Sequence, residues 1–118
     1  MKNGINWNEL CTPDPKSAAQ FYGAMFGWTT EPMPGMDHYT ILKHGDSMFG
    51  GVMAPPKPGI PPHWLNYVTV DDVDAAVAQA ISLGASVCLP AMDIGSAGRI
   101  AIIVDPQGAS IGLHQSNC

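Results

Sequence analysis

The sequence predicts an α+β fold made of two βαβββ modules in tandem. The chain has 118 residues, of which 46% are hydrophobic and 13% charged, so it is long enough and apolar enough for one domain with a core. Two segments with helical apolar spacing each follow a strand-like run and an aspartate. One such module cannot cover both faces of its own sheet. We therefore expect a curved mixed sheet with the helices on its outer face and a concave face that can hold a ligand.

The first module is expected to span residues 1–53. Asp14 has the character of an N-cap and Pro15 suits the first helical position, so a helix should start there. Apolar residues then recur at helical spacing, with Met25 among the expected core residues, and Gly27 should end the helix. The strands of this module are expected at residues 5–12, 28–30, 37–43 and 47–53.

A proline-rich connector, APPKPGIPPH at residues 54–63, separates the modules and cannot form a central strand. The second module is expected to span residues 64–118. Asp71 and Asp72 should cap its helix, and Gly84 should end it. Its strands are expected at 64–70, 85–90 (ended by Pro90), 99–105 and 109–115.

An internal repeat relates the two modules. With an offset of 57 residues, Trp7 falls on Trp64, and the stop glycines Gly27 and Gly84 coincide. The same offset places Thr12 on Thr69 and Asp14 on Asp71.

The composition excludes several classes of partner. The formal net charge is −5 and there is no basic cluster, which argues against nucleic acid. No apolar run is long enough to span a membrane and the opening residues lack a signal-peptide pattern, so we expect a cytoplasmic protein. The cysteines Cys11, Cys88 and Cys118 form no metal-binding spacing and are expected to be reduced thiols.

The repeat, together with TPDPKSAAQFYGAMFGW, VDDVDAAVAQAISLGASV and the closing DPQGASIGL, resembles the vicinal oxygen chelate superfamily. That superfamily includes glyoxalase I, bleomycin-resistance proteins and extradiol dioxygenases. The opening WNEL…FYGAMFGW is most similar to its small glyoxalase-like members. The resemblance implies the fold described above and a homodimer.

The resemblance also implies four metal-ligand positions, on the first and last strand of each module. Counted from the stop glycines and the DPQG turn, they fall on Trp7, Trp64, Gly112 and either Gly50 or Gly51. Indole N–H only donates and glycine has no side chain, so none of these residues can hold a metal. We therefore expect no metal or other cofactor, with the two indoles lining the vacated space.

A shifted metal set is the alternative. Strand alternation puts Glu9 and Cys11 on the face of Trp7, Asn66 and Val68 on that of Trp64, and His114 on that of Gly112. Glu9 and His114 could then act as ligands or as catalytic groups, although metal sites usually need three or more well-placed ligands.

Three functions remain open at this point. The favoured one is binding of a small, largely apolar or aromatic metabolite or drug. The alternatives are a metal-dependent lyase, isomerase or dioxygenase using Glu9 and His114, and a dimeric interaction module without a ligand. The expected ligand-binding residues are Trp7, Glu9, Tyr39, Phe49, Trp64, Asn66, Gly112 and His114.

The remaining basic side chains are expected to be structural or solvated. Arg99 could hold an anionic group, but a surface ion pair with an acid such as Asp93 is preferred. The histidines outside the predicted site are expected to be exposed or structural: His38, His44 and His63.

Overall fold

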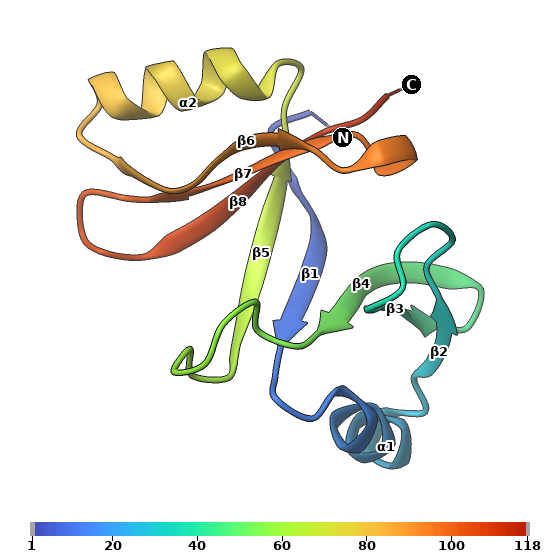
Figure 1. The fold of residues 1–118 in the computed structure, drawn as a ribbon. Coiled ribbons are helices and arrows are strands. Elements are labelled where there is room, and N and C mark those ends of the chain that lie inside the picture. Colours follow the sequence, from blue (N-terminus) through green and yellow to red (C-terminus); the bar gives the residue numbers. More distant parts are fainter. Residues whose placement is uncertain (1, 118) are drawn as a thin grey trace. The chain divides into compact units, whose positions relative to one another are not determined.

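The computed structural model describes residues 2–117, and these fall into two compact units. The first unit comprises residues 7–65, and the second comprises residues 66–117 together with the segment before residue 7. Each unit holds one helix and a mixed sheet, which confirms the predicted α+β class (Figure 1). The strands β1 (Ile5–Cys11) and β5 (His63–Thr69) contribute residues to both units.

The first unit has the strand order β2-β3-β4-β1. β1 runs parallel to β4, and the other neighbouring strands are antiparallel. After β1, its elements are α1 (Pro15–Phe26), β2 (Thr29–Pro32), β3 (Tyr39–His44) and β4 (Ser47–Met53).

Helix α1 starts and ends as the sequence predicts. Both carboxylate oxygens of Asp14 accept hydrogen bonds from Ser17, one from its backbone N–H at 3.1 Å and one from its hydroxyl at 2.8 Å. Pro15 occupies the first turn, and Gly27 ends the helix at φ 76°, a conformation that costs other residues steric strain.

The core of the first unit is made by Leu10, Leu42 and Val52, against which Ala18 and Tyr22 of α1 pack. The prediction that Met25 belongs to this core is wrong, because its side chain is 59% exposed. Only a narrow stripe of α1 touches the sheet, so the residues beside that stripe remain in contact with solvent.

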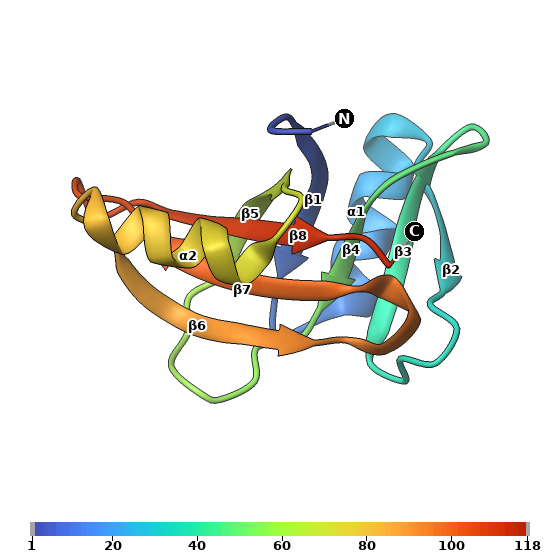
Figure 2. The same cartoon turned by 90° about the horizontal axis from the view of Figure 1, so that it is seen from above.

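The second unit has the strand order β5-β8-β7-β6, with β5 parallel to β8 and the other pairs antiparallel. Figure 2 shows α2 lying along one face of β6, β7 and β8. After β5, its elements are α2 (Val73–Ser82), β6 (Ser86–Asp93), a short 3-10 turn (Gly95–Ala97), β7 (Arg99–Val104) and β8 (Ser110–Gln115).

Strand β6 continues to Asp93, so the expectation that Pro90 ends it is wrong. It pairs with β7 alone, at the outer edge of its sheet, and its register shifts between Leu89 and Met92. An edge strand tolerates proline because one of its sides needs no ladder hydrogen bonds.

The repeat is shifted by one residue from the predicted alignment in the first strands. The N-cap of α2 is Asp72, which follows the N-cap Asp14 by 58 residues. Helix α2 has 10 residues where α1 has 12, so an alignment based on the stop glycines places the first strands out of register. With the caps aligned, the counterpart of Trp7 is Leu65 and not Trp64. A shift of one residue moves a strand side chain to the opposite face of the sheet.

Of the cysteines, Cys11 is buried and Cys88 is exposed, and both are free thiols. Cys118 lies outside the described residues. Neither helix in residues 2–117 has the length and apolarity needed to cross a lipid bilayer.

Candidate ligand-binding site

One face of the first unit's sheet, opposite α1, carries the candidate site. Leu10 points into the core beneath α1, so its neighbours Glu9 and Cys11, and Trp7 beyond them, point to the other side. Glu9 lies beside Gly51 of β4 in the parallel ladder. Tyr39, at the start of β3, pairs with Met53 and shares this face.

A chain of hydrogen bonds connects three of these side chains. The Trp7 Nε1–H donates to the Tyr39 hydroxyl at 2.8 Å, and that hydroxyl donates to Glu9 Oε1 at 3.0 Å. Burial of the Tyr39 ring, reinforced by the negative charge of Glu9, raises the pKa of the phenol far above its ordinary value. Tyr39 is therefore a neutral phenol at any physiological pH, with its proton directed at the carboxylate.

Gly51 makes room for the Tyr39 ring. A Cβ atom added at Gly51 would collide with the ring carbons and the hydroxyl of Tyr39. A Cβ atom added at Gly50 would point to the other face and collide with the backbone carbonyl of Asn8. Of the two positions that the sequence left open, Gly51 is therefore the one on the face of Trp7.

The second unit repeats this arrangement with different residues. Tyr67 is 4% exposed and pairs with Gly112, and a Cβ atom at Gly112 would collide with the Tyr67 ring. His114 lies two residues further along β8, and its Nε2 is 2.6 Å from the carbonyl oxygen of Ala97 in the preceding loop. A carbonyl oxygen only accepts hydrogen bonds, so Nε2 carries the proton in this bond. The bond connects β8 to the loop that contains Ala97.

The described residues do not fit the divalent ion of the superfamily. Two of the implied ligand positions, Gly51 and Gly112, lie beneath tyrosine rings that occupy the space of a ligating side chain. A third position holds Trp7, whose indole N–H is committed to Tyr39. Within residues 2–117, no three His, Cys, Asp or Glu side chains are grouped so that they could hold a metal ion.

Two of the expected site residues in the first unit do not lie with Trp7. The Trp64 ring packs against Tyr22 of α1 and against Trp28, at centroid separations of 5.6 and 6.4 Å, so it lies on the α1 side of the sheet. Asn66 belongs to the second unit. The position of Trp64 corrects the expectation that both indoles line one space, and the one-residue shift of the repeat is the cause.

Phe49 is displaced for another reason. The register between β3 and β4 shifts after Leu42, which pairs with Gly50 while the next residue pairs with Met48. Phe49 is thus an extra residue in the ladder, and its ring packs against Trp28 at 4.6 Å on the α1 side. The structure brings together Trp7, Glu9 and Tyr39, adds Gly51 and, in the other unit, gives Tyr67 a matching place.

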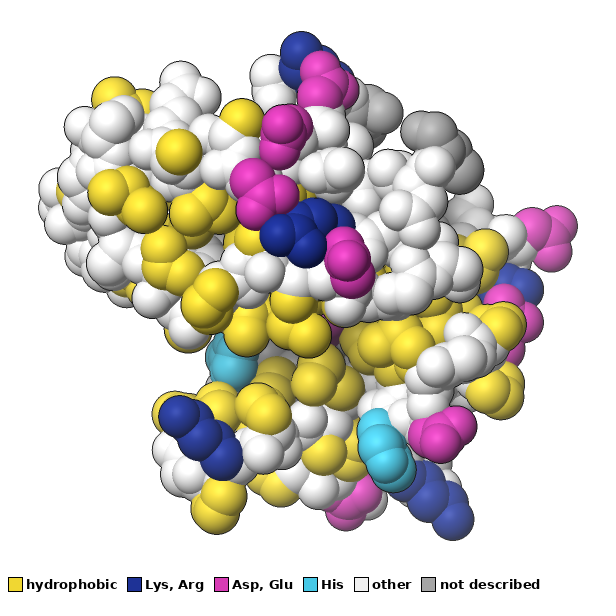
Figure 3. Space-filling view, turned by 45° about the horizontal axis from the view of Figure 1, so that its top comes forward, with side chains coloured by type: hydrophobic (Ala, Val, Ile, Leu, Met, Phe, Trp, Pro, Cys, Tyr) yellow, Lys and Arg dark blue, Asp and Glu magenta, His cyan; other side chains and the backbone are white. Residues whose placement is uncertain are grey.

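The basic residues outside the site behave largely as expected. The Arg99 guanidinium contacts both carboxylate oxygens of Asp74 at 2.9 Å and one of Asp93 at 3.1 Å, which confirms a surface ion pair. This pairing holds the pKa of Asp74 below its usual value. The histidines at 38, 44 and 63 are all exposed. Figure 3 shows acidic and basic side chains lying next to one another in a row near the top of the view.

Two βαβββ units of this kind define an α+β protein with the vicinal oxygen chelate fold. The family model of the glyoxalase-like domain matches residues 7–114, and the chain belongs to that family.

Two curated relatives are similar to the chain in sequence. The chain is 47% identical over 105 residues to CFP32 of Mycobacterium tuberculosis, a protein provisionally named as a glyoxylase, and the match covers 87% of the chain. It is 30% identical over 123 residues to the anthracycline biosynthesis protein DnrV of Streptomyces peucetius, with 91% of the chain covered. The chain spans only 40% and 45% of the length of these two relatives.

Solved structures agree on the fold. Methylmalonyl-CoA epimerase from Mycobacterium tuberculosis superposes with a TM-score of 0.68 at 19% identity, covering 98% of this chain and 89% of that one. The Streptomyces coelicolor epimerase, solved in complex with 2-nitronate-propionyl-CoA, gives a TM-score of 0.70 at 19% identity, covering 100% of this chain and 97% of that one.

Proposed function

We propose that this protein binds a small, planar, largely apolar or aromatic molecule on the sheet face that carries Trp7, Tyr39 and Glu9, and that it does so without a divalent metal. The observation that supports this most directly is the hydrogen-bonded chain from the Trp7 indole through the Tyr39 hydroxyl to Glu9. These side chains occupy a face on which the superfamily places metal ligands.

The chemistry of this face favours stacking over coordination. The hydrogen bonds fix the orientations of the indole and the phenol, so little side-chain entropy remains to be lost when a flat ligand settles on them. Glu9 places a negative charge beside the two rings. A neutral or cationic ligand is therefore favoured over an anionic one, because an anion would be repelled in a partly desolvated setting.

The names of the relatives suggest a class of ligand to test first. Anthracyclines are planar polycyclic compounds, and two relatives are named for their biosynthesis. A planar tricyclic or tetracyclic ligand would match the indole and phenol rings in shape and polarity. The relatives are longer than this chain, so their activities are carried over only as part of this proposal.

The alternative of metal-dependent catalysis through Glu9 and His114 has less support. Each of these residues is engaged within its own unit, Glu9 with Tyr39 and His114 with the carbonyl of Ala97.

Intrinsic tryptophan fluorescence tests the proposal. A panel of planar aromatic compounds, with neutral acridone as the tricyclic reference, is titrated into the protein in the presence of EDTA. We expect saturable quenching for at least one member, weakened by Trp7→Phe and by Tyr39→Phe. Trp64→Phe is the matched control, because it removes an indole on the α1 side and should leave the affinity unchanged. No saturable quenching by any compound would contradict the proposal.

We also propose that the protein forms a homodimer. Phe21, Met25 and Phe26 of α1 are 58%, 59% and 53% exposed, and such a grouping of large apolar side chains is common where another surface packs. A symmetric dimer is the commonest arrangement for soluble oligomers.

A further inference from the structure

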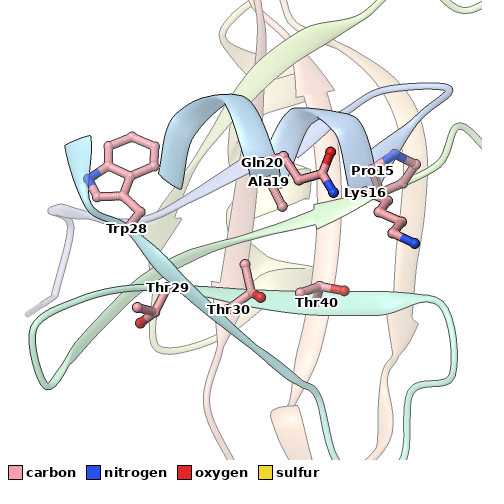
Figure 4. Close-up of a pocket in the computed structure, with 8 residues that line it drawn as sticks. All are labelled: Pro15, Lys16, Ala19, Gln20, Trp28, Thr29, Thr30 and Thr40. Atoms are coloured by element: carbon pink, nitrogen blue, oxygen red, sulfur yellow. The ribbon is translucent and has the colours of Figure 1, made fainter. Parts of the chain in front are cut away.

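A second surface feature of the first unit lies between α1 and the β2–β3 edge of the sheet. It is a groove of about 640 Å³; in Figure 4, Ala19 and Lys16 of α1 point toward the strands and Thr30 of β2 points toward the helix. The groove is on the side of the sheet that faces α1, whereas Trp7, Tyr39 and Glu9 are on the opposite side. It is therefore separate from the site of the proposed function.

The floor of the groove is apolar and rigid. Pro15 and Ala19 come from α1, and Trp28 follows the helix, and all of these side chains are half-buried. The Trp28 ring is fixed by its contacts with Tyr22 and Phe49, at centroid separations of 5.3 and 4.6 Å. A flat or aliphatic body could rest on this floor without disturbing the core.

The walls carry hydrogen-bonding groups that the protein leaves unused. Thr30 and Thr40 lie on the α1 side of the sheet, because Thr30 pairs with the core residue Leu42 and Thr40 lies two residues before Leu42. Gln20 and Lys16 reach in from α1. Within residues 2–117, none of these four side chains has a hydrogen bond or salt bridge to the protein, so their donor groups are available to a ligand.

The one charged side chain among the lining residues is the cation Lys16. Asp14, the nearest acid along the chain, is not among them; its carboxylate caps α1, and its charge interacts with that of Lys16. Glu31 of β2 pairs with Ile41 in the ladder, on the other face of the sheet, and contacts Lys43 at 4.0 Å.

We propose that this groove is a binding site for a small monocarboxylate with an apolar body. The carboxylate would accept hydrogen bonds from the Lys16 ammonium and from the threonine hydroxyls, while the apolar body would cover Ala19 and Trp28. One ammonium balances one negative charge, so a dianion such as a phosphate monoester would keep an uncompensated charge. The site does not depend on the proposed function.

Backbone amide chemical shifts test this site with benzoate, benzamide and benzylammonium as probes of one shape and three charges. Benzoate at millimolar concentration should shift the amides of Lys16, Gln20, Thr30 and Thr40 in a saturable way. Benzamide should bind more weakly, and benzylammonium should not bind. The Lys16→Gln variant should weaken benzoate about fivefold, as expected for one exposed charge-assisted hydrogen bond. Lys57→Gln, in the connector, removes an equal charge elsewhere and should have no effect.

A second variant tests the shape of the groove. Ala19→Leu fills the floor and should abolish the shifts, while Asp14 still caps α1. The proposal is overturned if benzoate causes no saturable shifts, if Lys16→Gln and Lys57→Gln behave alike, or if the shifts map to residues 7–11. Acridone quenching, followed in the same variants, should remain unchanged, so failure of one site is distinguishable from failure of the other.

Discussion

Tyr39 makes more of the contacts that define the candidate site than any other side chain in it. Its hydroxyl accepts a hydrogen bond from the Trp7 indole N–H and donates one to Glu9, and its ring fills the space above Gly51. Each of these roles depends on the others. The glycine admits the ring, the ring positions the hydroxyl, and the hydroxyl holds the indole and the carboxylate at fixed orientations.

Removing the Tyr39 hydroxyl should therefore cost stability as well as binding. Tyr39→Phe leaves the Trp7 N–H and a Glu9 oxygen without this partner on a partly buried face. We expect a loss of about 1–3 kcal/mol in the free energy of unfolding, measured by urea denaturation. Tyr22→Phe, whose hydroxyl has no hydrogen bond within residues 2–117, is the matched control. An equal effect of both substitutions would show that the hydrogen-bonded chain contributes nothing.

Gly51 should not tolerate a side chain while the Tyr39 ring is present. Gly51→Ala is expected to destabilise the protein by about 1–3 kcal/mol, the usual cost of overpacking. In a Tyr39→Ala background the same substitution should cost much less, because the obstructing ring is gone. A double-mutant cycle measures this coupling. Additive effects would argue that the ring and the glycine are independent.

At the level of single elements, the helix caps and turns follow local rules that sequence reveals well. Asp14 and Asp72 cap the two helices, and Asp105 accepts backbone hydrogen bonds from Gln107 and Ala109 in the β7–β8 turn. These backbone donors hold the pKa of Asp105 below its ordinary value.

The lowered pKa predicts the direction of a pH effect. A carboxyl group with a depressed pKa in the folded state stabilises the protein above the unfolded-state pKa near 3.8, and this stabilisation is lost as the pH falls through the lower folded value. Asp105→Asn should therefore reduce the dependence of the melting temperature on pH below about 4. An unchanged acid dependence would contradict this assignment.

The Asp72 cap can be tested separately. Asp72→Ala removes the hydrogen bond from the Ala75 N–H at 3.1 Å and should cost about 0.5–2 kcal/mol, read from urea unfolding. Asp71→Ala, one residue earlier, breaks only an exposed ion pair with Lys2 and should cost less. The opposite ranking would identify Asp71 as the cap.

These caps also explain what the sequence could and could not predict. The elements, the apolar face of each strand and the grouping of Trp7 with Glu9 followed from caps, stop signals and strand alternation. The place of Trp64 did not, because α2 is shorter than α1 and the stop glycines align the first strands one residue out of register. Aligning Asp14 with Asp72 would have corrected it. The bulge that displaces Phe49 has no signal in the sequence, since it arises from the pairing of two strands.

At the scale of the whole molecule, few charges and many exposed apolar side chains favour association. We expect sedimentation velocity to show a dimer, and the double substitution Phe21→Ser with Met25→Ser to shift it toward monomer, because both side chains are more than half exposed on α1. Ile81→Ser with Leu83→Ser, equally exposed around the end of α2, is the control. A monomer at all concentrations would exclude the dimer.

The family resemblance makes a metal the natural first guess for this fold, and the tyrosine rings over Gly51 and Gly112 argue against it. The most direct measurement is a fluorescence titration of EDTA-dialysed protein with the tightest-binding planar compound of the panel, repeated after adding back Zn²⁺, Ni²⁺, Mn²⁺ or Fe²⁺. Equal affinity in all conditions, weakened by Trp7→Phe, is the predicted result. Binding that appears only after a metal is restored would contradict it.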